Sequence, residues 1–410
     1  MRKMMNIYVC LFLEQEDSLW HYHLTQTLRK MGYRVFIPQE IGLQESWNIL
    51  TQGCWAKRNQ WQLTERILDD VKTRVKKEGV DLFFCYLFPF QFKPHLFKEL
   101  TKLGIPSVYF FCDNLSYKCI AKDYAPYATL NWVTETRAMK QFKASGSKAI
   151  YLPMAANPDI NYPLATEEII EISFAGAKNP YRRDILGKVA ASGLDLRIYG
   201  KNWSAKKRNN HYLESGKQAV NKYAKFRFID KLAEHISAKE RSLLNLFKYG
   251  LEGRRRNKQY IKLGEEYENI LQAVVERQPF LDICRVYPGN LLDLSQVNKI
   301  YSLSSVSIGF NDQFNYSDGL YFHTNLRNFE AAMAGACYLV EATPEINELF
   351  ADEKEVMVFN TVDELIDKAR FLLKNELFRK QLRLACRKRA FLEHTWEHRF
   401  NKLFSVLGIE

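Results

Sequence analysis

The regular alternation of short apolar runs with amphipathic segments is the feature that most limits how this chain can fold. Residues 6–13, NIYVCLFL, are typical of a buried strand. Residues 19–31 place Leu24 and Leu28 at helical spacing and end before Gly32, and the next apolar run is YRVFIP. Strand, helix and strand in this order predict a βαβ unit with parallel strands.

The same alternation continues to about residue 155. It predicts further helices and strands in turn, namely helices at 61–77, 94–103 and 135–144 and strands at 80–88, 106–114, 129–134 and 149–153. Short apolar strands separated by helices are typical of a parallel, doubly wound sheet covered on both faces. We therefore expect a Rossmann-like first domain over residues 1–155.

A second series of the same kind follows. A strand at 172–175 runs through Gly176 into a helix near Tyr181, the next strand is LDLRIYG, and the series resumes over 289–311. Prolines cluster between the two series, and 410 residues exceed the size that one hydrophobic core usually reaches. The fold class predicted is α/β, with a second Rossmann-like domain over 156–390 that faces the first across a cleft.

A basic, mostly helical insertion interrupts the second series at about 201–287. Between residues 201 and 262 there are seventeen Lys or Arg against five Asp or Glu, an excess equal to the net charge of the whole chain, +12. One interpretation is a solvated helical hairpin. The other is a platform for a polyanion, either nucleic acid or an anionic membrane surface, with Arg254, Arg255, Arg256 and Lys258 as binding residues.

The first apolar run and the cysteine spacing indicate the cellular compartment. The first apolar run ends at Glu14, which is too short for a membrane span, and no small-residue cleavage site follows it. The eight cysteines form no C-x-x-C pair, so neither a zinc site nor a disulfide framework is indicated. We expect a cytoplasmic protein.

The stretch FEAAMAGACYLVEATPEINELF carries the clearest site signal. A helix is predicted from about Thr324 to Gly335, and its start faces the carboxyl end of a parallel sheet, where such sheets bind ligands. Free N–H groups at Thr324 and Asn325, together with Arg327, suit a diphosphate, and Glu330 suits ribose hydroxyls. The alternative is an ordinary ion pair on a solvated helix. We favour the ligand site because the small residues behind Glu330 allow close approach.

From residue 289 to 403 the chain resembles the carboxyl domain of CgeB-like glycosyltransferases, which have the GT-B fold. The matching features are R-x-x-E-x-x-x-x-G at 327–335, Pro-Glu at 344–345, Glu355 before VMVF, Asp-Glu-Leu at 363–365 and the closing HTWEHR. The resemblance implies a sugar-nucleotide donor held by the second domain and an acceptor held by the first. It also implies that a final helix, residues 391–410, packs back on the first domain.

Donor-binding roles carry over by position. The resemblance implies that Glu330 binds the donor ribose and Arg327 the diphosphate. The Gly176 loop with Arg182 or Arg183 would lie near the same phosphates, and Tyr287 to Gly289 would line the base pocket. Related retaining enzymes have a further glutamate eight positions before the second, where this chain has Phe322. The stereochemistry therefore stays open, and His323 is the neighbouring candidate for sugar or phosphate.

Transfer to a hydroxyl also calls for a base in an inverting enzyme. Asp113, at the end of a predicted strand, is the first candidate, and His21 and His23 follow. A turn or helix cap within CDNLS is an equal alternative for Asp113. No D-x-D motif ends a strand, and Arg with a helix start can stabilise a leaving diphosphate, so we expect no metal and no cofactor.

The sequence thus predicts a glycosyltransferase that uses a nucleotide diphosphate sugar, most often UDP-linked. Its acceptor is a glycan or surface polymer, a protein, or nucleic acid bases as in a phage-type DNA-modifying enzyme. The alternative is a non-catalytic nucleotide- or polyanion-binding protein that retains the GT-B fold, for which Phe322 is the main support.

Overall fold

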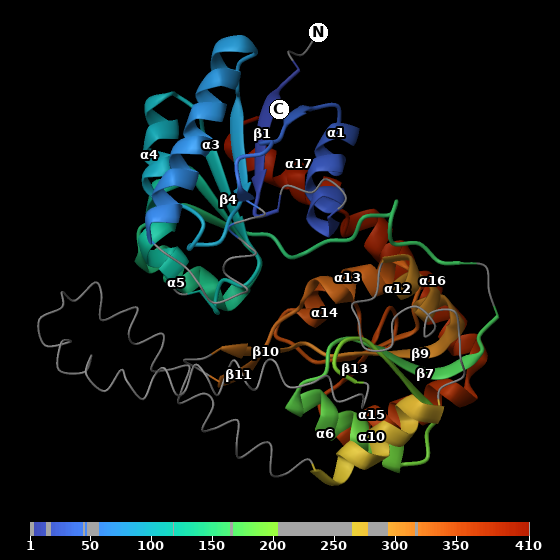
Figure 1. The fold of residues 1–410 in the computed structure, drawn as a ribbon. Coiled ribbons are helices and arrows are strands. Elements are labelled where there is room, and N and C mark those ends of the chain that lie inside the picture. The colour runs from blue at the N-terminus through green and yellow to red at the C-terminus, as the bar shows by residue number, and fades with distance from the viewer. Residues whose placement is uncertain are drawn as a thin grey trace, which may run out of the picture.

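The computed structural model describes residues 4–13, 18–43, 46, 57–117, 119–164, 167–203, 265–277, 294–315 and 319–409. These residues form two α/β domains, one above the other in Figure 1. The candidate residues Arg254, Arg255, Arg256, Lys258, Tyr287 and Gly289 lie outside the described residues. None of the described helices is long and apolar enough to cross a membrane.

The first domain is built on a six-stranded sheet in the order β2-β1-β3-β4-β5-β6, with every neighbouring pair parallel. Its strands are β1 (Asn6–Leu11), β2 (Arg34–Phe36), β3 (Leu82–Tyr86), β4 (Ser107–Phe111), β5 (Leu130–Val133) and β6 (Ala149–Tyr151). Its helical elements are η1 (His21–Thr25), α1 (Gln26–Lys30), α3 (Lys57–Lys77), α4 (His95–Lys102), η2 (Ile120–Tyr124), η3 (Ala125–Tyr127), η4 (Thr136–Ala138) and α5 (Met139–Ala144). The four central strands are buried along their whole length, because helices cover both faces.

The second domain has a five-stranded parallel sheet in the order β13-β12-β9-β7-β8 and a separate antiparallel hairpin. Its strands are β7 (Ile170–Ala175), β8 (Leu196–Tyr199), β9 (Ser304–Gly309), β10 (Asp312–Asn315), β11 (Gly319–Phe322), β12 (Tyr338–Glu341) and β13 (Met357–Phe359). Its helices are α6 (Pro180–Ala191), α10 (Glu265–Arg277), α12 (Leu294–Leu303), α13 (Leu326–Met333), α14 (Ile346–Leu349), α15 (Val362–Lys374) and α16 (Glu376–Glu393). Figure 1 shows α12, α13 and α16 on the face toward the first domain and α6, α10 and α15 on the other. The predicted fold class, two doubly wound domains, is confirmed.

A hairpin that was not predicted from the sequence follows β9. The sequence after β9 reads as polar, yet β10 and β11 pair antiparallel there. The sequence signal was Asp-Gly between two short apolar runs, which is typical of hairpin turns. The error matters because β11 carries Tyr321 toward the first domain.

The chain passes between the domains twice, and the two crossing segments are fastened together. Ala156 pairs with Thr395 in an isolated β-bridge. The guanidinium of Arg399 donates to the carbonyl oxygens of Pro153, Met154 and Glu393. Burial lowers the pKa of Arg399 to about 10, so this side chain stays charged at neutral pH.

The last helix, α17 (Trp396–Leu407), lies with the first domain. Its buried Trp396 and Phe400 contact the ring of Trp132 at centroid distances of 5.9 and 5.6 Å. Full burial of two large aromatic rings stabilises this contact by several kcal/mol, on the order of 2–3 each. The chain thus leaves the second domain, and α17 packs its buried face into the core of the first.

Helix α13 behaves as predicted at both ends. Asn325 caps its start, and Gly335 follows its end with φ +70°, the left-handed conformation that a helix C′ position favours. The small residues of α13 have a different role from the one expected. Ala331, Ala332 and Ala334 are fully buried where α13 packs on α16, and a Cβ at Gly335 would lie 3.6 Å from Pro163. They serve helix packing rather than ligand approach.

Candidate functional site

In the sheet of the second domain, β8 lies on one side of β7 and β9 lies on the other, so the order of the strands reverses between β7 and β9. The loops that follow β7 and β9 meet at this switch point. Asn179 caps α6 by accepting a hydrogen bond from the Arg182 backbone N–H at 2.8 Å. The Asp312 carboxylate accepts from Arg182 Nε and from Asn179 Nδ2, both at 2.6 Å. The guanidinium predicted to bind phosphate is therefore already paired, and a diphosphate would have to compete with Asp312 for it.

The neighbouring candidates of this loop have structural contacts. The guanidinium of Arg183 pairs with Asp184 at 2.9 Å and is mostly buried. Gly176 lies so close to Phe174 that an added Cβ would approach its ring to 2.6 Å. A Cβ on Gly200, whose φ is +134°, would meet the backbone of Gly176. Gly200 is needed because the two loops touch there through their backbones, and Gly176 because the ring of Phe174 occupies the space of a Cβ.

A buried polar group that the sequence did not reveal ties β9, β12 and α13 together. The side-chain Nδ2 of Asn311 donates to the Glu341 carbonyl at 2.7 Å. The backbone N–H of Asn311 donates to the Glu341 carboxylate at 2.9 Å. Asn311 Oδ1 accepts from Asn328 Nδ2 at 2.7 Å. Tyr181 donates its hydroxyl to the other carboxylate oxygen of Glu341. Burial raises the pKa of Glu341 to about 7, although these hydrogen bonds lower it.

The start of α13 is held at the carboxyl edge of the same sheet. Asn325 Oδ1 accepts from the Arg327 backbone N–H at 3.0 Å, and Asn325 Nδ2 donates to the Phe310 carbonyl. The hydroxyls of Thr324 and Thr343 lie 2.7 Å apart. The three predicted residues Thr324, Asn325 and Arg327 are thus brought to one helix end.

Glu330 has the environment of a binding residue. Its side chain is only 4% exposed, and Arg327 Nε lies 3.6 Å from its Oε2. The predicted i,i+3 contact therefore forms, but in the interior rather than on a solvated face. Burial alone would raise the pKa of Glu330, but the charge of Arg327 and the neighbouring His23 ring more than offset it, so its pKa is lowered. Oε1 has no hydrogen-bond donor among the described residues.

The two candidate histidines of the first domain differ. Both ring nitrogens of His21 are engaged, by the Thr25 hydroxyl at 2.9 Å and the Leu13 carbonyl at 3.2 Å. His23 is fully buried beside Trp396, and its Nε2 lies 3.7 Å from Glu330 Oε1 across the domain interface. Neither ring nitrogen of His23 has a hydrogen bond within the described part of the chain. His23 thus faces the candidate donor site, whereas His21 stabilises its own helical turn.

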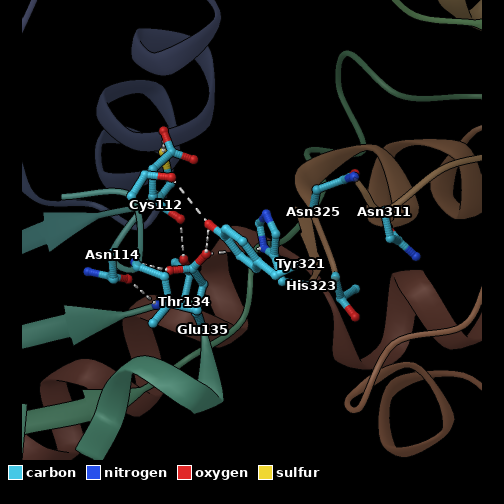
Figure 2. Close-up of polar contacts among 12 residues, drawn as sticks. Cys112, Asn114, Thr134, Glu135, Asn311, Tyr321, His323 and Asn325 are labelled. Atoms are coloured by element: carbon cyan, nitrogen blue, oxygen red, sulfur yellow. Dashed lines mark hydrogen bonds and ion pairs between the residues drawn. The ribbon is translucent and has the colours of Figure 1, made fainter. Parts of the chain in front are cut away.

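A second cluster crosses the interface beside Cys112 and Asn114, the neighbours of Asp113, and Figure 2 shows Glu135, Tyr321 and His323 within it. Tyr321 donates its hydroxyl to Glu135 Oε1 at 3.1 Å and lies 3.2 Å from Ser116 Oγ. His323 Nδ1 is 3.7 Å from the same Glu135 oxygen, and burial lowers the pKa of His323 to about 4. Burial also raises the pKa of Asp113. Asp113 and His323, predicted for different domains, therefore lie around one group, joined by Glu135.

Two residues of this region were not expected. Glu135 is the second residue after β5, and Glu345, from Pro-Glu, accepts a hydrogen bond from the Thr136 hydroxyl across the interface. A signal was present, since both carboxylates stand just beyond strand ends. Phe322, where a glutamate would stand in retaining relatives, contacts the ring of Tyr181 at 5.7 Å.

Comparison with known proteins fits this geometry. A family model described as glycosyl transferase-like matches residues 254–405, whereas no curated protein matches the chain. Sucrose-phosphate synthase from Thermosynechococcus elongatus is 13% identical with a TM-score of 0.56, over 98% of this chain and 99% of that chain. HepE of Anabaena, in complex with UDP and glucose, is 10% identical with a TM-score of 0.56, over 98% and 100%.

A third solved structure with the same arrangement is a glycosyltransferase from Rickettsia africae ESF-5. It is 11% identical with a TM-score of 0.56, over 99% of this chain and 98% of that chain. Because these identities are low, the likeness shows a shared fold. The two described domains have the GT-B fold, which confirms the predicted fold, while the CgeB-like subtype stays a prediction.

Proposed function

We propose that the chain is a glycosyltransferase that moves a sugar from a UDP-sugar to an acceptor hydroxyl. The observation that carries the proposal is Glu330, a buried carboxylate with one oxygen free of hydrogen-bond donors among the described residues, one turn beyond Arg327 at the start of α13. A ribose hydroxyl would complete that oxygen, since a buried acceptor without a donor is costly. The family match and the HepE complex with UDP support the same donor class.

In the proposed reaction the bond between the sugar C1 and the diphosphate oxygen breaks, and a bond from C1 to the acceptor oxygen forms. Arg327, whose side chain is 36% exposed, and the amino end of α13 supply positive charge to the departing diphosphate. This requires no metal. Asp113 accepts the proton of the acceptor hydroxyl, and its raised pKa makes it a stronger base than an exposed aspartate.

For the acceptor we infer an anionic polymer. Seventeen Lys or Arg against five Asp or Glu between residues 201 and 262 would hold phosphates, as in nucleic acid. Binding of duplex DNA should then weaken steeply with salt. A variant neutralised at Arg254, Arg255 and Arg256 should bind more weakly with a shallower salt slope, and equal binding would contradict the assignment.

The donor is tested with the full chain and a panel of UDP-, GDP- and ADP-sugars, by thermal stabilisation and by release of the nucleoside diphosphate. We expect one UDP-sugar to give both. Glu330→Gln should weaken donor binding about 10- to 100-fold, because a hydrogen bond to a charged group is lost. Glu348→Gln, an exposed glutamate on α14, is the matched control.

The outcomes separate the alternatives. If no nucleotide sugar stabilises the chain or releases its nucleoside diphosphate, the donor assignment is wrong. Stabilisation by UDP-sugars without any release, with acceptors of several classes supplied, would instead identify a non-catalytic nucleotide-binding protein, which Phe322 at the place of the first glutamate would then explain.

A further inference from the structure

Glu135 is a buried carboxylate that the proposed reaction leaves without a role. It is the second residue after β5, at the carboxyl edge of the first sheet, and is 1% exposed. A buried carboxylate is costly unless hydrogen bonds or partners compensate it. Its two oxygens bind groups from two different domains, and this division of contacts indicates its role.

One oxygen holds the loop that carries Asp113. Glu135 Oε2 accepts from the Leu115 backbone N–H at 2.6 Å. The preceding residue adds two more hydrogen bonds, because the Thr134 N–H donates to Asn114 Oδ1 at 3.1 Å and its hydroxyl donates to the Cys112 carbonyl at 2.9 Å. Thr134 and Glu135, the two residues after β5, therefore hydrogen-bond to both neighbours of Asp113 and to the residue two positions after it.

The other oxygen reaches the second domain. Glu135 Oε1 accepts from the Tyr321 hydroxyl, which also lies 3.2 Å from Ser116 Oγ in the Asp113 loop. Figure 2 shows Tyr321 extending from its hairpin between Glu135 and the backbone around Cys112. The hairpin β10–β11 thus contacts the loop twice, directly through Ser116 and indirectly through Glu135.

We infer that Glu135 is a positioning residue that couples docking of the β10–β11 hairpin to the geometry of the Asp113 loop. The inference rests on the proposed function. When the second domain is docked, Tyr321 and the loop share one carboxylate, and the base is held for the reaction. When the domains separate, Glu135 loses Tyr321 as its second partner, and Ser116 of the loop loses its contact with the same hydroxyl.

Electrostatics agrees with this geometry. The charged and titratable groups that face Glu135 are Cys112 and Asp113 from its own domain and Tyr321, His323 and Glu345 from the second. Burial, with Asp113 and Glu345, raises the pKa of Glu135 to about 8, so it is largely protonated at pH 7.

The test uses the full chain with Tyr321→Phe, Glu135→Gln and the double variant. Tyr321→Phe keeps the ring and removes one hydroxyl, so kcat should fall about five- to tenfold with the donor KM unchanged within about twofold. Glu135→Gln should lower kcat further and shift the pH–rate profile. The double variant should be no slower than Glu135→Gln, because the two groups act through one contact. Tyr162→Phe, a half-exposed tyrosine between the domains, is the control.

A second measurement does not depend on turnover. In Tyr321→Phe, hydrogen exchange of the 112–117 backbone should rise at least about threefold although the substitution lies in the other domain. Unchanged exchange there overturns the coupling, whether or not a donor has been found. With an active enzyme, wild-type kcat in Tyr321→Phe, or additive losses in the double variant, overturns it as well. Absence of turnover in the unaltered chain refutes the proposed function alone, and the exchange result then decides the coupling.

Discussion

The second domain should become less stable as the pH rises toward 7, because its folded state holds a proton on Glu341 that is released over this range. Its carboxylate is 5% exposed and faces Asp312, Arg182 and Tyr181. Burial raises its pKa from an ordinary 4.5 to about 7. Between these values the folded state keeps a proton that the unfolded state has released. The free energy of unfolding therefore falls with pH, by about 1.4 kcal/mol per pH unit.

Between pH 4.5 and pH 7 the free energy of unfolding falls by about 3 kcal/mol in total. The decrease begins near pH 4.5 and is complete above pH 7. Glu341→Gln carries no charge at any pH, so this loss should vanish. The variant gives up one acceptor, since an amide cannot accept with its nitrogen, and that costs about 1–2 kcal/mol at every pH. The difference in stability between the two proteins should therefore change by about 3 kcal/mol from pH 4.5 to 7.5 in favour of the variant.

Hydrogen exchange of the β9 and β12 amides reports the opening free energy of this domain itself, which matters because two domains need not unfold together. Measured from pH 4.5 to 7.5 and corrected for intrinsic exchange, wild type and Glu341→Gln should diverge. Glu171→Gln, an exposed glutamate on β7, should run parallel to wild type. A difference between wild type and Glu341→Gln that stays constant within about 0.5 kcal/mol would refute the reasoning.

Three further substitutions test the packing that positions the site. Trp396→Ala should destabilise the first domain by about 3–5 kcal/mol in urea unfolding, whereas Trp61→Ala, 55% exposed, should change it by less than about 1. Gly309→Ala should cost about 1–3 kcal/mol by the same assay, because the new Cβ would collide with the ring of Tyr338; a neutral effect would show that the ring can move. Asn325→Ala should lower the melting temperature by the equivalent of about 1 kcal/mol or more, because it loses both the α13 cap and the donor to the Phe310 carbonyl; Asn325→Asp keeps the cap acceptor and loses only the donor, so it should cost less, and equal losses would argue against a capping role.

Much of the fold could be predicted from local patterns. The apolar runs became β1, β3, β4 and β5 within two or three residues of their expected bounds, and α13 ends before Gly335 as its spacing indicated. These features depend on residues close together in the chain, where periodicity of 2 or 3.6 and the conformational freedom of glycine act directly. The hairpin β10–β11 was missed because polar residues masked its turn signal.

The site was predicted only in part. Asp113, His323, Arg327 and Glu330 do lie at the domain interface, because the carboxyl ends of parallel strands gather on one edge of each sheet. Their partners were not predictable. The sequence around Arg182 does not indicate Asp312 as its partner, because the two residues are 130 positions apart. The sequence around Glu135 likewise does not indicate Tyr321, which is 186 positions away.

The sequence by itself determined that this chain forms two parallel α/β sheets, and it located the helix that holds Arg327 and Glu330. Only the tertiary structure decided that Glu330 is buried against His23 of the other domain and that Glu135 joins the Asp113 loop to Tyr321. The physical reason is that periodicity states which face of an element is buried. Which buried faces meet depends on how two domains pack, and that is settled by contacts between segments far apart in the chain.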